Sequence, residues 1–273
     1  MLAQEMVSDE NGPKYTVRAL ERGMAILTCF SMDKPELGIT ELSNILGLHK
    51  ATVHRLLVTL TNNGMVEHND RNGKYRLGIK LFELGSVVAS QMDLRKRGLP
   101  ILEELGAQCG ETVHLVVLDR DEAIYVEKVE NPRALIRYSQ VGKRLPLHCT
   151  AVGKVLLAGL PDQEIARIVE TKGLPAYTRR TIVLPERLYE EIEEVRAKGY
   201  ALDAEELEEG LRCIAAPVRE FGGRVVAAVS ISGPSFRLSA VTAQDSLISM
   251  VKEASEKISR QLGWNAQTSS RTA

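Results

Sequence analysis

The stretch ITELSNILGLHKATVHRLLVTL, residues 39–60, decides the fold of the N-terminal part of the chain. It contains two segments in which apolar residues recur at intervals of three and four, the spacing that lines one face of a helix. These residues are Leu42, Ile45 and Leu46 in the first segment and Val53, Leu56, Leu57 and Leu60 in the second. Because a glycine, Gly47, joins the segments, the sequence predicts two short helices with a tight turn between them.

The side of the second helix opposite its leucines carries small, polar and cationic residues. Two helices whose second member has such an outward face are the parts of a helix-turn-helix, which places that member in the major groove of DNA. A plain helical hairpin with a solvated outer face is the alternative for these residues alone. The candidate DNA contacts of the stretch are Thr40, Lys50, Ala51, Thr52, His54, Arg55 and Thr59.

A predicted β-hairpin follows the two helices. The short runs Met65–His68 and Lys74–Leu77 flank the turn-forming sequence NDRNG. Its cations, which could contact backbone phosphates or a minor groove, are Arg71, Lys74 and Arg76. A surface hairpin without a role in binding is again the alternative. A further helix over Val17–Phe30 precedes the pair, so the order of elements predicts a winged helix-turn-helix over residues 14–78.

The charge of the chain is unevenly distributed. The net charge is −1, but residues 14–80 contain ten Lys and Arg against six Asp and Glu. A basic N-terminal region on a mildly acidic remainder suits a protein that uses one end on phosphates.

The four cysteines, Cys29, Cys109, Cys149 and Cys213, are scattered and form no CxxC pair. This spacing argues against a zinc ribbon or a disulfide scaffold. No apolar run approaches the roughly 18 residues that cross a bilayer, and no signal peptide is recognisable. We therefore expect a cytoplasmic protein that binds no membrane, metal or cofactor.

Residues 79–98 are predicted to form a linker helix. From Leu77 onward the apolar positions, Leu77, Leu81, Leu84 and Val88, have a 4-3-4 spacing like that of a coiled-coil seam, so the helix could pair with a second copy. Fewer than two full heptads are too short to hold a dimer alone, which leaves a simple connecting helix as the alternative.

The larger region, residues 99–264, mixes helices with hairpin-linked strands and predicts an α+β domain with a mainly antiparallel sheet. The predicted strands are 112–118, 123–129, 135–139, 211–218 and 224–232. The predicted helices are 101–109, 150–159, 162–170, 186–198 and 241–262.

With these motifs in hand, the chain resembles the IclR family of bacterial transcriptional regulators over nearly its whole length. The matching stretches are YTVRALERGMAIL, LGLHKATVHRLLVTL, YRLGIKLFELG, LPLHCTAVGKVLLA, and LDAEELEEGLRCIAAPV followed by VVAAVSISGP. The resemblance implies an N-terminal winged helix, a linker helix and a C-terminal GAF-like domain that binds a small organic effector. It also implies a homodimer or homotetramer.

The resemblance places effector contacts at Ala151 and Val152 (backbone), Asp203, Cys213, Ser230 and Ser232. Ala151 and Val152 lie where a helix is predicted to begin, and free N–H groups at such an end could hold a carboxylate. The two serines are two residues apart on one predicted strand, so their hydroxyls can point at one pocket.

Each of these positions also has a simpler explanation. Asp203 could cap the following turn, Cys213 could be a small buried hydrophobe, and the serines could satisfy neighbouring backbone groups. None is cationic, so an anionic effector would rely on helix N–H groups or on Arg137, Arg144 or His148; an uncharged or aromatic effector is the other option.

The leading hypothesis is an effector-responsive DNA-binding regulator, repressor or activator, of a metabolic operon. Its partners would be a near-palindromic double-stranded operator, a small molecule such as an organic acid, and further copies of the chain. The alternative is an enzyme-like GAF domain that senses ligand or redox state through Cys149 and Cys213. Because no catalytic signature is found in the sequence, an enzyme is not expected.

Overall fold

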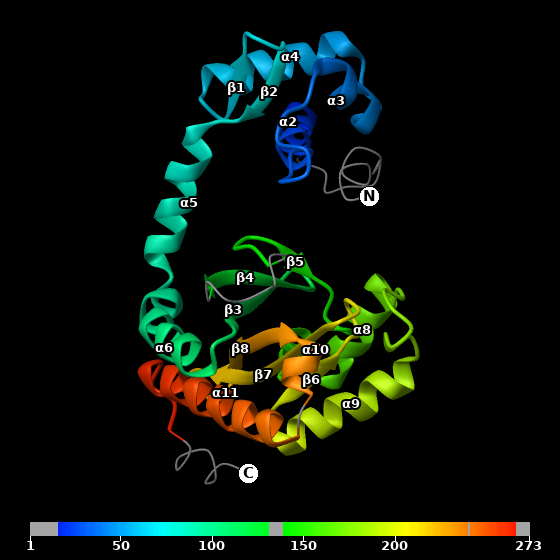
Figure 1. The fold of residues 1–273 in the computed structure, drawn as a ribbon. Coiled ribbons are helices and arrows are strands. Elements are labelled where there is room, and N and C mark those ends of the chain that lie inside the picture. Colours follow the sequence, from blue (N-terminus) through cyan, green and yellow to red (C-terminus); the bar gives the residue numbers. More distant parts are fainter. Residues whose placement is uncertain (1–15, 131–138, 240, 266–273) are drawn as a thin grey trace. The chain divides into compact units, whose positions relative to one another are not determined.

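The structure is a computed structural model that describes residues 16–130, 139–239 and 241–265 (Figure 1). The chain divides into two compact units, the first ending at Gln91 and the second beginning at Met92. The N-terminal residues 1–13 and most of the predicted strand at 135–139 lie outside the described residues.

The first unit begins with the three helices and the hairpin that the sequence predicts. The helices are α2 (Arg18–Thr28), α3 (Ile39–Leu46) and α4 (Lys50–Asn62), and the strands are β1 (Val66–Asn69) and β2 (Lys74–Leu77). The predicted winged helix-turn-helix fold is thereby confirmed. Its core holds Leu42, Leu46, Val53 and Leu57 from the predicted stripes of α3 and α4. Helix α2 packs on this core through Ala25 and Ile26, whereas its Leu20 and Met24 are exposed.

The hairpin is tied to the helices through its return strand. β1 and β2 pair antiparallel, with Val66 opposite Leu77 and Asn69 opposite Lys74. Tyr75 also exchanges two backbone hydrogen bonds of 2.9 Å with Leu37, which lies in the loop before α3. The wing therefore has a fixed position relative to the helix-turn-helix.

The predicted linker helix ends earlier than expected. Helix α5 (Ile79–Gln91) stops before Met92, whose dihedral angles are not helical, and α6 (Asp93–Cys109) then runs without interruption through Pro100. A helical proline costs about 3 kcal/mol. Leu102 and Leu105 of α6 are buried in the core of the second unit, and burying one leucine is worth about 1.5–3 kcal/mol, so packing outweighs the proline.

The second unit is built on a six-stranded sheet in which all neighbouring strands are antiparallel. The strand order is β5-β4-β3-β8-β7-β6. The strands are β3 (Thr112–Asp119), β4 (Glu122–Val129), β5 (Arg144–Leu145), β6 (Ala201–Ala204), β7 (Leu211–Arg219) and β8 (Val225–Pro234). This confirms the predicted α+β class; β5 and β6, of two and four residues, are too short to show a periodic pattern.

Helices cover both faces of this sheet (Figure 1). On one face, α6 and α11 (Val241–Gln261) pack over Leu115, Val229 and Ile231. On the other face lie α7 (Ala151–Ala158), α8 (Asp162–Lys172) and α9 (Pro185–Lys198), and a short helix, α10 (Ser235–Leu238), follows β8. No helix in the described ranges is both long enough and apolar enough to span a membrane.

Candidate functional site

Helix α4 presents a polar face away from the core of the first unit. Val53 and Leu57 are fully buried beneath it. The predicted contact residues Lys50, Ala51, His54, Arg55 and Thr59 are exposed, Thr52 is half-buried, and Thr40 is exposed at the start of α3. Within the described residues, the side chains of Lys50, His54 and Arg55 form no ion pair, so their hydrogen-bonding groups are available to a partner.

The turn between α3 and α4 is fixed by local hydrogen bonds. Gly47 adopts the left-handed conformation, with φ at 65°, which other residues reach only with strain. The Ser43 hydroxyl donates to the carbonyl of Leu48 at 2.6 Å, and the Leu48 N–H donates to the carbonyl of Ser43. The orientation of α4 relative to α3 follows from this turn.

The three cations of the wing differ in their surroundings. Arg76 donates to Glu67 Oε2 through two nitrogens, at 3.0 and 2.7 Å, and Lys74 forms an ion pair of 3.1 Å with Glu41 of α3. Arg71, at the exposed tip, has no acidic partner within the described residues. Sequence reasoning treated the three alike, since it could not show that two of them face carboxylates.

A polar cavity in the second unit brings together all six predicted effector contacts. It lies between the N-terminus of α7 and the strands β3, β4, β7 and β8, and its volume is about 60 Å³. Among its lining residues are Ala151, Val152, Asp203, Cys213, Ser230 and Ser232. Four separate segments of the chain supply them.

The N-terminus of α7 is held against the segment that precedes it. Thr150 caps the helix: its hydroxyl accepts from the Gly153 N–H at 3.1 Å and donates to the carbonyl of Pro146 at 2.8 Å. A Cβ on Gly153 would lie 2.2 Å from the carbonyl oxygen of Leu147, so only glycine permits this approach. The N–H groups of Ala151 and Val152, in the first turn, have no acceptor within the helix.

His114, a buried member of this cavity, was not among the predicted effector contacts. Its ring nitrogens contact the hydroxyls of Ser230, at 3.3 Å, and Ser139, at 2.7 Å. Burial, with a smaller contribution from Lys128, lowers the pKa of His114 to about 3, so the ring is neutral. The Tyr125 ring packs against it at a tilt of 44°, with ring centroids 4.7 Å apart.

Asp203 both lines the cavity and caps a turn. Its Oδ1 accepts from the N–H of Glu206 at 2.7 Å, which is the capping role that the sequence left open. Burial is the main cause that raises the pKa of Asp203 to about 7, and the neighbouring Glu206 adds to it. Near neutral pH this carboxyl can therefore be a hydrogen-bond donor as well as an acceptor.

The two cysteines of the redox alternative are poor nucleophiles in this environment. Burial raises the pKa of both Cys149 and Cys213, so each is a thiol rather than a reactive thiolate. The Ser232 hydroxyl donates to Cys213 Sγ at 3.0 Å. Nor do the described residues contain a cluster of three or more His, Cys, Asp or Glu that could hold a metal.

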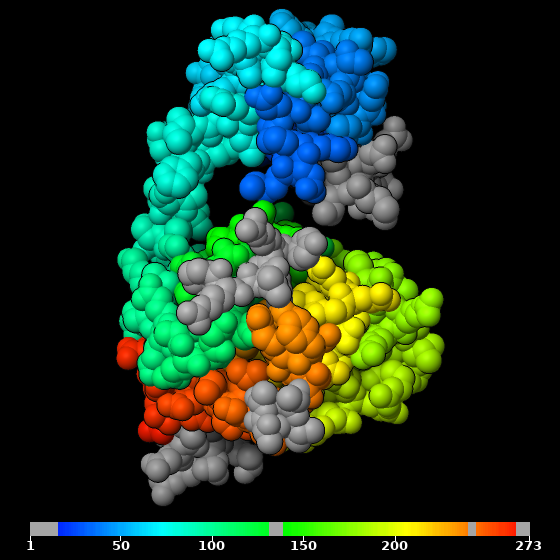
Figure 2. Space-filling view, in the orientation of Figure 1, coloured from blue at the N-terminus to red at the C-terminus, as the bar shows by residue number. Residues whose placement is uncertain are grey.

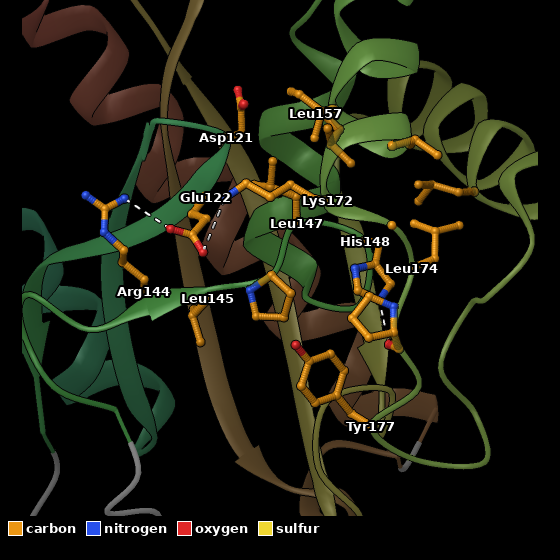
Figure 3. A pocket seen from close by; sticks show the side chains of 16 residues that line it. Asp121, Glu122, Arg144, Leu145, Leu147, His148, Leu157, Lys172, Leu174 and Tyr177 are labelled. Atoms are coloured by element: carbon orange, nitrogen blue, oxygen red, sulfur yellow. Dashed lines mark hydrogen bonds and ion pairs between the residues drawn. The ribbon is translucent and has the colours of Figure 1, made fainter. Parts of the chain in front are cut away.

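Several residues of the polar cavity were not predicted, and two expected neighbours lie elsewhere. The additional lining residues are His114, Tyr125, Ser139, Lys143, Leu145, Thr150, Leu207, Glu208 and Leu211. Arg144 and His148, which were expected near an anionic effector, instead line a separate cavity (Figure 3), and Arg137 is outside the described residues. The cation of the polar cavity is Lys143, which pattern reading could not distinguish from an ordinary surface lysine.

Lys154 of α7 points into the core. Its Nζ contacts Glu206 Oε1 at 2.6 Å, the Leu202 carbonyl at 2.9 Å and Glu191 Oε1 at 3.1 Å. This fully buried ion pair ties α7 to the turn that begins at Asp203. It fixes two walls of the polar cavity relative to each other.

A winged helix-turn-helix with an exposed polar face on α4, followed by a separate second unit, is typical of one class of proteins: DNA-binding transcriptional regulators. Comparison with known proteins agrees. The family model for the IclR helix-turn-helix domain matches residues 19–70, and the model for the bacterial transcriptional regulator IclR C-terminal domain matches residues 86–260. The chain therefore belongs to the IclR family, and it is a DNA-binding transcriptional regulator.

Individual relatives support the same assignment. The chain is 40% identical over 250 residues to the HTH-type transcriptional regulator XynR of Escherichia coli (strain K12), covering 92% of this chain and 99% of that protein. The crystal structure of a regulator from Rhodococcus sp. RHA1 matches with a TM-score of 0.80 and 33% identity, over 91% of this chain and 99% of that one. An IclR homologue from Microbacterium hydrocarbonoxydans, complexed with 4-hydroxybenzoate, matches with a TM-score of 0.79 and 27% identity, over 90% and 99% of the chains.

Proposed function

We propose that this regulator is a homo-oligomer whose affinity for a near-palindromic operator is set by a small molecule bound in the polar cavity. The observation that carries the proposal is the convergence of residues from α7, β7, β8 and the segment around Asp203 on one polar cavity. The regulated genes would be those of a metabolic operon, and the site of action would be the cytoplasm, where the chromosome is.

The exposed face of α4 would read the operator. Two copies in a dimer would enter major grooves about one helical turn, or ~10 bp, apart or a multiple of it. Arg55 is the candidate for a bidentate guanine contact, because it stands free on the outward face. The proposed DNA contacts are Thr40, Lys50, Ala51, Thr52, His54, Arg55 and Thr59, with Arg71, Lys74 and Arg76 on backbone phosphates.

The proposed domain boundaries are those predicted from the sequence, except that the sensing domain begins earlier. Residues 14–78 form the DNA-binding domain and α5 is the linker. The sensing domain extends to Trp264 but would begin at Met92 rather than at residue 99. Supporting this revision, Arg95, in the first turn of α6, forms an ion pair of 2.8 Å with Glu127 of β4.

The effector would be a small organic acid held at the N-terminus of α7. The free N–H groups of Ala151 and Val152 and the positive end of the helix dipole favour a carboxylate there, and Lys143 adds a cation. The 4-hydroxybenzoate bound by the relative from Microbacterium hydrocarbonoxydans is a carboxylate of this kind. At about 60 Å³ the polar cavity holds few heavy atoms, so a larger effector requires lining side chains to move.

Exposed apolar side chains on α5 and α2 support the proposed oligomer. None of the side chains of α5 is buried (Figure 2, teal). Its large apolar residues that are exposed are Ile79, Phe82, Leu84, Val87 and Val88, and α2 with its N-cap adds Val17, Leu20 and Met24. Because monomers rarely expose so many large apolar residues, a second copy of the chain would cover them in a dimer or tetramer.

A ligand screen followed by operator titration tests the coupling. Full-length protein is screened by thermal shift against small acids, sugars and aromatics, since a specific ligand raises stability by mass action. Each hit is then added at saturation while operator affinity is measured by fluorescence anisotropy. We expect a change of about 5- to 150-fold in affinity. Unchanged operator affinity with every stabilising ligand would show that the second unit does not control DNA binding.

A further inference from the structure

A second, larger cavity lies on the outer side of the segment that leads into α7. This outer cavity has a volume of about 240 Å³, four times that of the polar cavity, and is lined by β4, β5, α8 and the loop after α8 (Figure 3). Leu147, Leu157, Ile168 and Leu188 form its apolar floor. Its size is just below the range of about 300–1,000 Å³ that is typical of ligand pockets.

Most charged groups at its rim are already paired. Asp121 accepts from two nitrogens of Arg167, at 2.9 and 2.6 Å. Arg144 donates to the Asp119 carbonyl at 2.9 Å and also to the Asp119 carboxylate. These residues have little capacity left for a ligand.

Lys172, the last residue of α8, is the charged residue of this rim with the weakest ion pairing. Within the described residues its Nζ forms one ion pair, with Glu122 at 3.8 Å, and Glu122 also faces Arg144 at 3.5 Å. The Asp121 carboxylate is near enough to Lys172 to interact with it electrostatically, but it is held by Arg167. Figure 3 shows the Lys172 amine pointing toward Glu122 across the cavity rim. An ion pair of this length is weak, so the ammonium group can turn to an incoming anion at little cost.

Two neutral side chains on the far wall also have unused hydrogen-bonding groups. His148 Nε2 lies 3.0 Å from the Pro175 carbonyl, which can only accept, so Nε2 carries the proton and Nδ1 is an acceptor. Tyr177 stands beside His148, and its hydroxyl has no partner among the described residues. The outer cavity thus combines an apolar floor, one available cation and two polar groups opposite it.

From this arrangement we propose that the outer cavity is a second ligand site, which takes a small carboxylic acid with a compact apolar body. The carboxylate pairs with Lys172, and the body lies on Leu147, Ile168 and Leu174. A hydroxyl at the far end of the ligand would donate to His148 Nδ1. A neutral molecule of the same shape leaves Lys172 unused and binds more weakly.

The outer cavity is distinct from the polar cavity, although the two share a wall. Leu145 lines both, and the chain from Pro146 to Thr150 runs between them: His148 faces the outer cavity, whereas Thr150 faces the polar cavity. A ligand in the outer cavity therefore contacts the segment that fixes the N-terminus of α7. The second site does not depend on the function proposed for the polar cavity.

Methyl-labelled full-length protein, titrated with benzoate and with its neutral isostere benzamide, tests this site by NMR. We expect saturable shifts of the Ile168 and Leu174 methyls with benzoate, with a Kd below about 1 mM, and binding of benzamide that is at least about tenfold weaker. Shifts confined to Leu207 and Leu211, which line only the polar cavity, would overturn the proposal. So would the absence of saturable shifts.

Charge variants assign the anion contact. Lys172→Met should raise the Kd for benzoate by about 10- to 100-fold, because a charged hydrogen bond is lost, and Lys172→Arg should restore most of the affinity. Lys198→Met on α9 is the matched control and should bind benzoate as the wild type does. Equal affinities for wild type and Lys172→Met would reject the site. Operator binding by all three variants is measured in parallel and should be unchanged, so a failed second site is distinguishable from a failed regulator.

Discussion

Asp203 is the residue whose chemistry depends most on the fold. An exposed aspartate is ionised at neutral pH, whereas burial raises the pKa of Asp203 to about 7. The folded protein therefore binds this proton more tightly than the unfolded chain does. The contribution of Asp203 to the free energy of unfolding is largest below about pH 4 and is lost as the pH rises through about 7.

The Asp203→Asn variant should make the stability of the second unit less dependent on pH. Between pH 5 and pH 8 we expect the free energy of unfolding of the wild type to fall by about 1–3 kcal/mol as Asp203 ionises, and that of the variant to fall by less. Calorimetric unfolding of both proteins across this range measures the difference. Glu206, whose pKa is also raised by burial, would leave some slope in the variant. Identical pH profiles would show that Asp203 is not the titrating group.

The three cations of the wing are not equally available to DNA phosphates. Arg71 is exposed at the tip, while Arg76 is paired with Glu67 and Lys74 with Glu41. A phosphate contact from either paired residue must first replace a carboxylate, so its net gain is smaller. Glu36 keeps the tip in place by accepting from the side chains of Asn69 and Asn72, at 3.0 and 2.7 Å.

Arg71→Ala should therefore weaken binding to all duplexes more than Arg76→Ala does. If Arg71 neutralises one phosphate, its loss lowers the slope of log affinity against log salt by about 0.9. Anisotropy titrations of operator and random duplex at several salt concentrations provide the measurement. Arg187→Ala on α9 serves as an arginine control that should bind DNA normally. A larger loss for Arg76→Ala than for Arg71→Ala would contradict the assignment.

Elements with a long periodic pattern were predictable from the sequence, and short or tertiary features were not. The spacing of leucines located α3 and α4, and turn residues located the hairpin. The break between α5 and α6 at Met92 has no signal in the sequence. Gly98 and Pro100 are the residues that usually end a helix, but α6 continues through both because Leu102 and Leu105 pack in the core. The contacts of Lys74 with Glu41, and of His114 with Ser230, join residues far apart in the chain.

For the polar cavity, the family resemblance supplied six lining residues that composition and spacing could not. The residues that were missed come from β3, β4, the segments 139–145 and 207–211, and the N-cap of α7, where a pattern gives no reason to select one side chain over another. The outer cavity was not anticipated at all. Its walls are ordinary leucines and surface charges until the fold places them around one space.

At the scale of the whole molecule, assembly should depend on the exposed side chains of α5. Phe82 is 72% exposed in the single chain. Phe82→Glu would place a charge in a dimer interface built on this helix, and it should shift the sedimentation equilibrium toward smaller species and weaken operator binding together. Phe221→Glu is the matched control, because Phe221 is 84% exposed at the tip of the β7–β8 hairpin. Unchanged assembly of Phe82→Glu would rule out α5 as an interface.

Selection of duplexes from a random pool, with full-length wild type and with Arg55→Ala, measures directly whether α4 reads a DNA sequence. The wild type should enrich near-palindromes whose half-sites are separated by ~10 bp or a multiple of it. Arg55→Ala should lose preference at one base of each half-site, at a cost of about 1–3 kcal/mol. Enrichment of the same bases by both proteins, or of no sequence by the wild type, would contradict recognition by α4.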